Sequence, residues 1–142
     1  MFKHIIMRKP NYDKFPSTKY EGEIIIGWEE IVEKLKSASA GSKTVAVELY
    51  TGVYESEVID ALSSLGAREL IIMRDLMKPE DEVVAMTAGL MTDDTLFGHV
   101  TYLDMKDYFC PEKLEQVRQQ INDSDKEWIV IGSGASLLSG QK

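Results

Sequence analysis

Two kinds of apolar pattern take turns along this chain, one typical of β-strands and the other typical of amphipathic helices. Mostly apolar runs of β-favouring residues predict strands of a parallel sheet covered on both faces, and one stretch alternates as a strand does. In addition, Ile24–Ile26 either forms a short strand or leads into a helix, and Phe2–Met7 is expected to be a short edge strand. The main expected strands are Thr44–Tyr50, Glu69–Met73, Phe97–Leu103 and Glu127–Ile131.

Between these runs, apolar residues recur at three- and four-residue spacing, which predicts amphipathic helices. This spacing predicts helices from about Gly27 to Ala40, along the stripe Val58–Leu65 and from Pro111 onwards. A helix start with proline and acidic residues at Lys78–Asp81 predicts a further helix from about Pro79 to Met91. Alternating strands and helices favour right-handed βαβ crossovers. The predicted fold is therefore α/β, a three-layer sandwich with a mostly parallel sheet of about five strands, Rossmann-like or P-loop-kinase-like.

The first part of the chain differs from the rest. Residues 1–22 contain Pro10 and Pro16 among clustered charges, and we expect an extended arm there. Residues 23–142 are expected to form a single α/β domain. The sequence ends at Gly140-Gln141-Lys142, just after an apolar helix start, which predicts a domain truncated at its C-terminus.

Charge and composition narrow the function classes. The 24 acidic and 16 basic residues give a net charge of -8, which disfavours nucleic acid and anionic membranes as partners. No apolar segment approaches the ~20 residues that a membrane span needs, and the run Ile5–Met7 is too short for a signal peptide. Cys110 is the sole cysteine and cannot form an internal disulfide, which fits a reducing compartment. We expect a soluble, cytoplasmic protein.

Candidate binding residues follow from the predicted fold. In open parallel sheets, ligands bind beyond the carboxyl ends of the strands. Glu48, near one such end, either faces a cleft or marks the point where its strand emerges into solvent, and the second alternative is favoured. The candidate ligand-binding residues are Thr51, Gly52, Arg74, Asp75, Gly132, Ser133, Gly134 and Ser136.

The turn Gly132-Ser133-Gly134 precedes an apolar helix start, an arrangement that lets backbone amides approach an anion. A dinucleotide fingerprint would need a small residue where Leu137 stands, and a Walker-type loop needs a Gly-Lys-Ser/Thr ending that Gly140-Gln141-Lys142 does not supply. A structural turn is therefore favoured over a phosphate cradle. Two histidines and one cysteine do not make a spaced zinc set, so no metal site is predicted, and catalytic residues and cofactors stay unassigned.

Short motifs are spread over most of the chain, at Asn11–Pro16, Gly27–Glu29, Val47–Val53, Thr92–Asp94, Phe97-Gly98 and Gly132–Ser136. Together they resemble the N-terminal, kinase-like α/β region of long bacterial class I mannose-6-phosphate isomerases. In that family a region similar to P-loop nucleoside kinases precedes a cupin isomerase. The resemblance implies that the zinc ligands and catalytic residues of the isomerase would lie beyond Lys142.

Three functions remain open. The first is a non-catalytic or regulatory domain of a mannose-6-phosphate isomerase-like protein, with a degenerate pocket for a nucleotide or sugar phosphate around Gly132–Ser136 and a C-terminal cupin as neighbour. The second is a nucleoside or sugar kinase-like phosphotransferase active only in a longer protein, with Glu48, Asp75 or Asp93 as base or magnesium ligand. The third is a protein-interaction domain whose arm docks a partner or a second copy, which would give a homo-oligomer.

Overall fold

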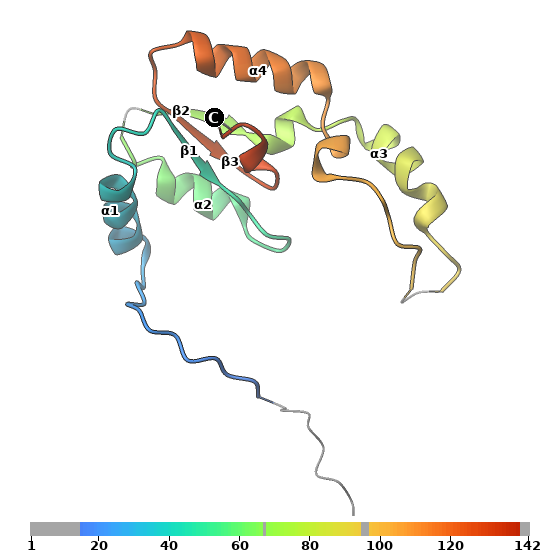
Figure 1. Cartoon of the computed structure of the whole chain (residues 1–142), viewed down its shortest axis with the longest axis horizontal. Coiled ribbons are helices and arrows are strands. Elements are labelled where there is room, and N and C mark those ends of the chain that lie inside the picture. Colours follow the sequence, from blue (N-terminus) through green and yellow to red (C-terminus); the bar gives the residue numbers. More distant parts are fainter. Residues whose placement is uncertain (1–14, 67, 95–96, 140–142) are drawn as a thin grey trace, which may run out of the picture.

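The computed structural model describes residues 15–66, 68–94 and 97–139 of the chain (Figure 1). The α-helices are α1 (Trp28–Ala38), α2 (Glu55–Leu62), α3 (Glu80–Thr87) and α4 (Pro111–Asp123). The strands are β1 (Thr44–Val47), β2 (Glu69–Ile72) and β3 (Trp128–Ile131). Short 3-10 helices are η1 (Met73–Leu76), η2 (Ala88–Leu90), η3 (Met105–Tyr108) and η4 (Ala135–Leu137).

The strands form one parallel sheet in the order β1-β3-β2. Trp128 of the central strand pairs with Thr44 on one side and with Glu69 on the other. All four residues of β3 are buried, as expected for a parallel strand covered on both faces. The prediction of an α/β chain with a parallel sheet is confirmed, but the described residues contain three strands where about five were predicted.

Helices cover both faces of this sheet (Figure 1). Ile129 and Ile131 point into a cluster with Val32 of α1 and with Val58 and Leu62 of α2. Their neighbours along β3 point the other way, into a second cluster that α4 covers, with Leu114, Ile121, Trp128 and Val130 as members. The chain first crosses over β3 in going from β1 to β2, and it then turns back from β2 to β3. Because both crossovers are right-handed but run in opposite directions, α2 and α4 lie on opposite faces of the sheet.

The strand expected at Phe97–Leu103 is wrong: this stretch carries no strand in the structure. Its apolar side chains do not face the core, and Tyr102 is 98% exposed. Of the two alternatives for Ile24–Ile26, the strand is absent, and the residues precede α1, which begins at Trp28. The strand expected at Thr44–Tyr50 is present but ends at Val47. The edge strand expected at Phe2–Met7 lies outside the described residues, as does Gly140-Gln141-Lys142.

A long segment between η1 and α4 leaves the sheet and returns to it, and we call Lys78–Tyr108 the excursion. Its base is closed by two backbone hydrogen bonds, from Lys78 N–H to the carbonyl of Tyr108 at 3.0 Å and from Cys110 N–H to the carbonyl of Leu76 at 3.0 Å. Phe109, at this base, is only 2% exposed. Beyond the base, α3 and the chain that follows it project away from the sheet (Figure 1), and α3 buries none of its side chains.

The segment that precedes α1 also leaves the domain. From residue 15 to residue 27 it contains neither helix nor strand and extends away from the sheet and helices (Figure 1). Among the described residues, no helix is both long enough and apolar enough to cross a bilayer.

Candidate functional site

The carboxyl ends of β1, β2 and β3 lie at one edge of the sheet because all three strands are parallel. After β1 the chain continues to α2 on one face, whereas after β3 it continues to Ala135 and Leu138, which pack in the α4-side cluster. The two continuations diverge between β1 and β3. This divergence is the topological switch point at which open parallel sheets bind ligands.

The carboxylate of Glu48 occupies this point. Its Oε2 accepts a hydrogen bond from the Gly134 N–H at 2.9 Å, and its Oε1 accepts one from the Ser136 N–H at 2.7 Å. Two further bonds join the same segments: Gly132 N–H donates to the Val47 carbonyl at 3.1 Å, and Ser133 Oγ donates to the Leu49 carbonyl at 2.8 Å. The glycine turn after β3 is therefore tied to the end of β1.

These contacts set the ionisation of Glu48. Partial burial raises the pKa of its carboxyl, but hydrogen bonds from the Ser136 side chain and from the amides of Ser136, Gly134 and Ala135 together outweigh burial. The net result is a pKa below the ordinary value of 4.5. The carboxylate form is thus the one that the turn stabilises.

The two glycines of the turn are required by its shape and by its packing. Gly132 has a φ of 131°, and a Cβ built on it would lie 2.9 Å from the Cβ of Met73. Gly134 has a φ of 84°, and its Cβ would lie 2.9 Å from ring atoms of Phe109. L-residues with side chains rarely adopt these backbone angles. The turn thus packs directly on the base of the excursion.

The other predicted site residues belong to different contacts. Thr51 and Gly52 form an exposed turn before α2, where Val53 N–H donates to the Tyr50 carbonyl at 3.2 Å. Arg74 pairs with Glu55 of α2 at 2.6 Å, not with its neighbour Asp75. Asp75 contributes a backbone carbonyl, which accepts from Lys113 Nζ at 2.9 Å. Hydrogen bonds therefore join Gly132, Ser133, Gly134 and Ser136 to the end of β1, while Arg74 and Asp75 contact helices.

Other titratable groups add little chemistry to this edge. Over residues 15–66, 68–94 and 97–139, no three histidine, cysteine, aspartate or glutamate side chains are grouped so as to hold a metal ion. The Cys110 thiol donates to Glu112 Oε2 at 3.0 Å, and this bond is the main cause that lowers the pKa of the Glu112 carboxyl. What the edge presents is a carboxylate already bound to two amides.

Replacing Glu48 by glutamine should lower the free energy of unfolding by roughly 1 kcal/mol at neutral pH, a figure already reduced for the solvent exposure of the side chain. The folded-state pKa is depressed, so the stabilisation by Glu48 is present above 4.5 and is lost as the pH falls through the folded value. Urea unfolding of both proteins across this range should show a gap that closes on acidification. A gap of constant size would contradict the assignment.

The sequence indicated the turn and Glu48 separately but not their contact. The sequence did contain two separate signals: a carboxylate near the end of one expected strand and a glycine turn directly after another. The sequence also gave no sign of the exposed excursion, because the alternation in Phe97–Leu103 predicted a strand.

Comparison with known proteins gives one match. No curated protein and no solved structure matches the chain. Residues 27–142 match the model of a family described as a domain of unknown function, DUF8485. The match begins one residue before α1 and includes the sheet, the excursion and the glycine turn. This chain therefore belongs to the DUF8485 family.

Proposed function

We propose that this chain is a protein-interaction domain and that the excursion is the surface that docks a partner protein. The observation that carries this proposal is the set of large apolar side chains that the excursion leaves exposed. Large apolar side chains that are exposed together on one segment of a folded domain are typical of an interaction site. The exposed apolar residues of the excursion are Val84, Met91, Phe97, Val100, Tyr102 and Met105.

Packing and hydrogen bonds hold the excursion at its base and further out. Phe109 and the two backbone hydrogen bonds fix its base. Further out, His99 N–H donates to the Leu90 carbonyl at 2.9 Å, and the side chain of Thr92 donates to the Phe97 carbonyl. Gly98 lies so close to this contact that a Cβ would be 2.7 Å from the Leu90 carbonyl oxygen. A fixed surface loses less conformational entropy on binding than a loose one.

The charge of the excursion indicates which charge the partner protein should present to it. Acidic side chains outnumber the basic Lys78 and Lys106, so the partner is expected to present basic groups around an apolar patch. A second copy of this chain would bring the same negative charge to the interface, which disfavours self-association there. The acidic residues of the excursion are Glu80, Asp81, Glu82, Asp93, Asp94, Asp104 and Asp107.

Photo-crosslinking from the excursion tests this proposal. A photoreactive amino acid at Tyr102 of the full chain, in cells that express it, should crosslink one other protein, which the same group at Tyr50 should not capture. Both positions are highly exposed, at 98% and 85%, so exposure alone does not separate them. With that partner purified, Tyr102→Ala should weaken binding at least about ten-fold, the effect of losing a central aromatic contact.

Two outcomes would overturn the proposal. One is equal labelling from Tyr102 and Tyr50, which would mean that the excursion captures proteins at random. The other is a product with the mass of two copies of the chain, which would assign the surface to self-association.

The phosphate-binding alternative has less support from the geometry. A nucleotide or sugar phosphate at Gly132–Ser136 would need the amides of Gly134 and Ser136, which donate to Glu48. The anion would also meet the negative charge of that carboxylate. The relationship to mannose-6-phosphate isomerases, the cupin neighbour and the kinase-like activity stay predictions.

A further inference from the structure

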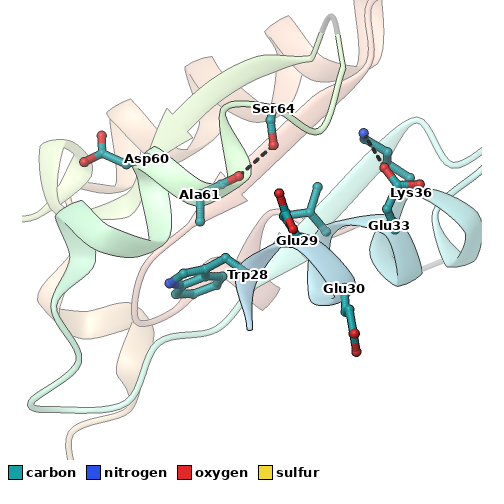
Figure 2. Close-up of a pocket in the computed structure, with 9 residues that line it drawn as sticks. Trp28, Glu29, Glu30, Glu33, Lys36, Asp60, Ala61 and Ser64 are labelled. Atoms are coloured by element: carbon teal, nitrogen blue, oxygen red, sulfur yellow. Dashed lines mark hydrogen bonds and ion pairs between the residues drawn. The ribbon is translucent and has the colours of Figure 1, made fainter. Parts of the chain in front are cut away.

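A groove lies between α1 and α2, the two helices that cover the face of the sheet opposite α4 (Figure 2). It encloses about 650 Å³, and the residues that line it lie in α1, in α2 or directly after α2. A second hollow of about 350 Å³ adjoins it, and Glu30 and Glu33 line both. The groove is therefore a concave surface separate from the excursion.

Apolar side chains form part of this groove. Trp28, the first residue of α1, lines it and is 44% exposed. Ala61 of α2 lies close to Trp28 (Figure 2), and its short side chain leaves room for a side chain from another molecule. Tryptophan is among the residues that contribute most binding energy at protein interfaces. The groove can thus receive an apolar side chain beside an exposed indole ring.

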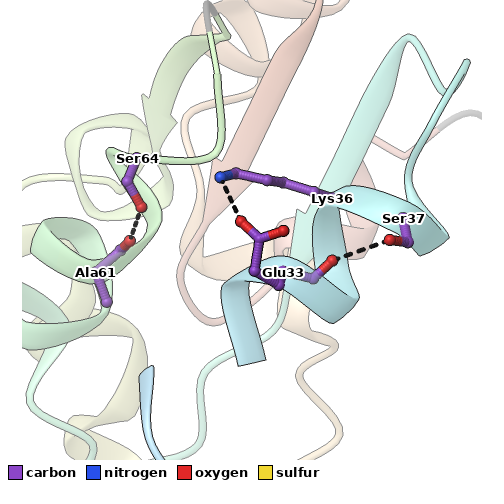
Figure 3. Close-up of polar contacts among 5 residues, drawn as sticks. All are labelled: Glu33, Lys36, Ser37, Ala61 and Ser64. Carbon is purple, nitrogen blue, oxygen red and sulfur yellow. Dashed lines mark hydrogen bonds and ion pairs between the residues drawn. The ribbon is translucent and has the colours of Figure 1, made fainter. Parts of the chain in front are cut away.

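Carboxylates surround the apolar surface. Glu29, Glu30 and Glu33 come from α1, and Asp60 comes from α2. Among the described residues that line the groove, Lys36 is the one cation, and it is paired with Glu33 at 2.8 Å (Figure 3). In the part of the chain that the structure describes, the side-chain carboxylates of Glu29, Glu30 and Asp60 make no hydrogen bond or ion pair. An occupant of the groove should therefore carry cations as well as apolar side chains.

The helices alone do not account for all of these carboxylates. The helix dipole favours Glu29 and Glu30, which lie in the first turn of α1. Asp60 lies in the last turn of α2, where the dipole disfavours a negative charge. Glu29 and Glu33 are four residues apart on α1, a spacing at which like charges repel and weaken a helix. Cations bound in the groove would offset both of these unfavourable interactions.

We propose that the groove binds a helix of a partner protein whose apolar stripe is flanked by lysine or arginine side chains. The apolar stripe contacts Trp28 and Ala61, and the cations pair with Glu29 and Glu33 on one side and with Asp60 on the other. Glu29 and Glu33 are one helical turn apart, which matches cations one turn apart on the partner. Amphipathic helices bind grooves in this manner. Charge complementarity favours a basic partner over a second copy of this chain, whose net charge is -8.

An NMR titration with synthetic peptides tests the inference. The probe is a leucine-lysine peptide with one apolar face and about 18 residues, long enough to form a helix. Added to the isotope-labelled full chain, it should shift the Trp28 indole N–H and the Ala61 amide signals in a saturable way. A peptide with glutamate in place of every lysine should leave both signals unmoved. A peptide with the same residues in shuffled order has no apolar stripe and should bind at least about ten-fold more weakly.

Matched variants separate the groove from the overall negative charge of the chain. Neutralising the groove with Glu29→Gln, Glu33→Gln and Asp60→Asn should weaken binding of the leucine-lysine peptide about ten-fold. A control that removes the same charge from α3 should change binding less than about two-fold, because only nearby charges act strongly. The control variant carries Glu80→Gln, Asp81→Asn and Glu82→Gln. The amide signals of β3, which is buried, report whether each variant is folded.

Three results would overturn the inference. One is a shift of the Tyr102 amide without shifts at Trp28 and Ala61, which would leave the proposal for the excursion standing. The second is equal weakening by the groove variant and the α3 variant, which would mean attraction to the overall charge only. The third is equal binding of spermine, a cation without an apolar stripe, which would mean an adventitious cation and no helix site. The peptide comparisons use the unaltered chain, so they stay decisive even if a variant does not fold.

Discussion

Replacing Gly132 by alanine is expected to lower the free energy of unfolding by roughly 3 to 5 kcal/mol, among the largest effects that one substitution has. Two costs add: a φ of 131° is strained for alanine, and the new Cβ would lie 2.9 Å from the Cβ of Met73. Met73 is fully buried and cannot move aside without disturbing the core. Urea unfolding of the purified chain measures the change.

Gly41→Ala separates the two costs. Gly41 also has a positive φ, 78°, but a Cβ there meets no atom within 4 Å. This control should therefore lose only the strain part, about 1 to 2 kcal/mol. Equal losses for the two variants would show that Gly132 does not approach Met73 as closely as described.

Replacing Phe109 by alanine is expected to cost about 3 to 5 kcal/mol, the usual range for a buried phenylalanine. The ring is 2% exposed, belongs to the cluster that includes Trp128 and Val130, and packs over Gly134. Because Phe109 also fixes the base of the excursion, amide hydrogen exchange in α3 should speed up by more than exchange in β1. Chemical denaturation and exchange, measured on the same sample, test both effects.

Tyr102→Ala is the matched control for this aromatic truncation. Tyr102 is as exposed as Phe109 is buried, so its removal should change the free energy of unfolding by less than about 0.5 kcal/mol. A large loss at Tyr102 would mean that the excursion packs on the domain and is not free to dock a partner.

The sequence predicted α1, α2 and α4 because each has an apolar stripe of the right period, and it predicted α3 from the proline and acidic residues at its start. The helix α1 lies within its expected range, α4 begins at the expected Pro111, and α3 begins as expected but ends at Thr87, before the expected Met91. The strands β1, β2 and β3 lie inside runs that were expected to be strands. The strand prediction for Phe97–Leu103 was wrong because its pattern shows only the order of apolar and polar residues. A strand also needs a neighbour to accept and donate its backbone hydrogen bonds, and no pattern within the stretch reports one.

The site could be predicted only in part. The order of strands is not readable from one sequence, and only the pairing of β1 with β3 brings Glu48 to a turn 86 residues away. Arg68 makes a second kind of contact that the sequence did not predict. Its guanidinium donates to the carbonyls of Ser39 and Ser42 at 3.0 and 3.1 Å and pairs with Glu127 at 3.1 Å. Carbonyl partners leave no trace in residue type, so this contact had no sequence signal.

Two regions of the surface, the carboxyl edge of the sheet and the excursion, therefore differ in what they expose. At the carboxyl edge of the sheet, where α/β proteins bind ligands, the Glu48 carboxylate already receives the turn amides. On the excursion, large apolar side chains are exposed to solvent, and backbone hydrogen bonds fix the base of the segment. This contrast is why we place the function on the excursion and not at the glycine turn.

The most direct test of this account is an NMR titration of the Gly134 and Ser136 amide signals. On acidification, both should shift together with the Glu48 carboxyl, with a midpoint below 4.5. At neutral pH, inorganic phosphate at millimolar concentration should leave both signals unmoved, because Glu48 holds the amides. Signals that ignore the carboxyl titration, or that move when phosphate is added to the wild-type chain, would contradict the account and return the glycine turn to the role of an anion site.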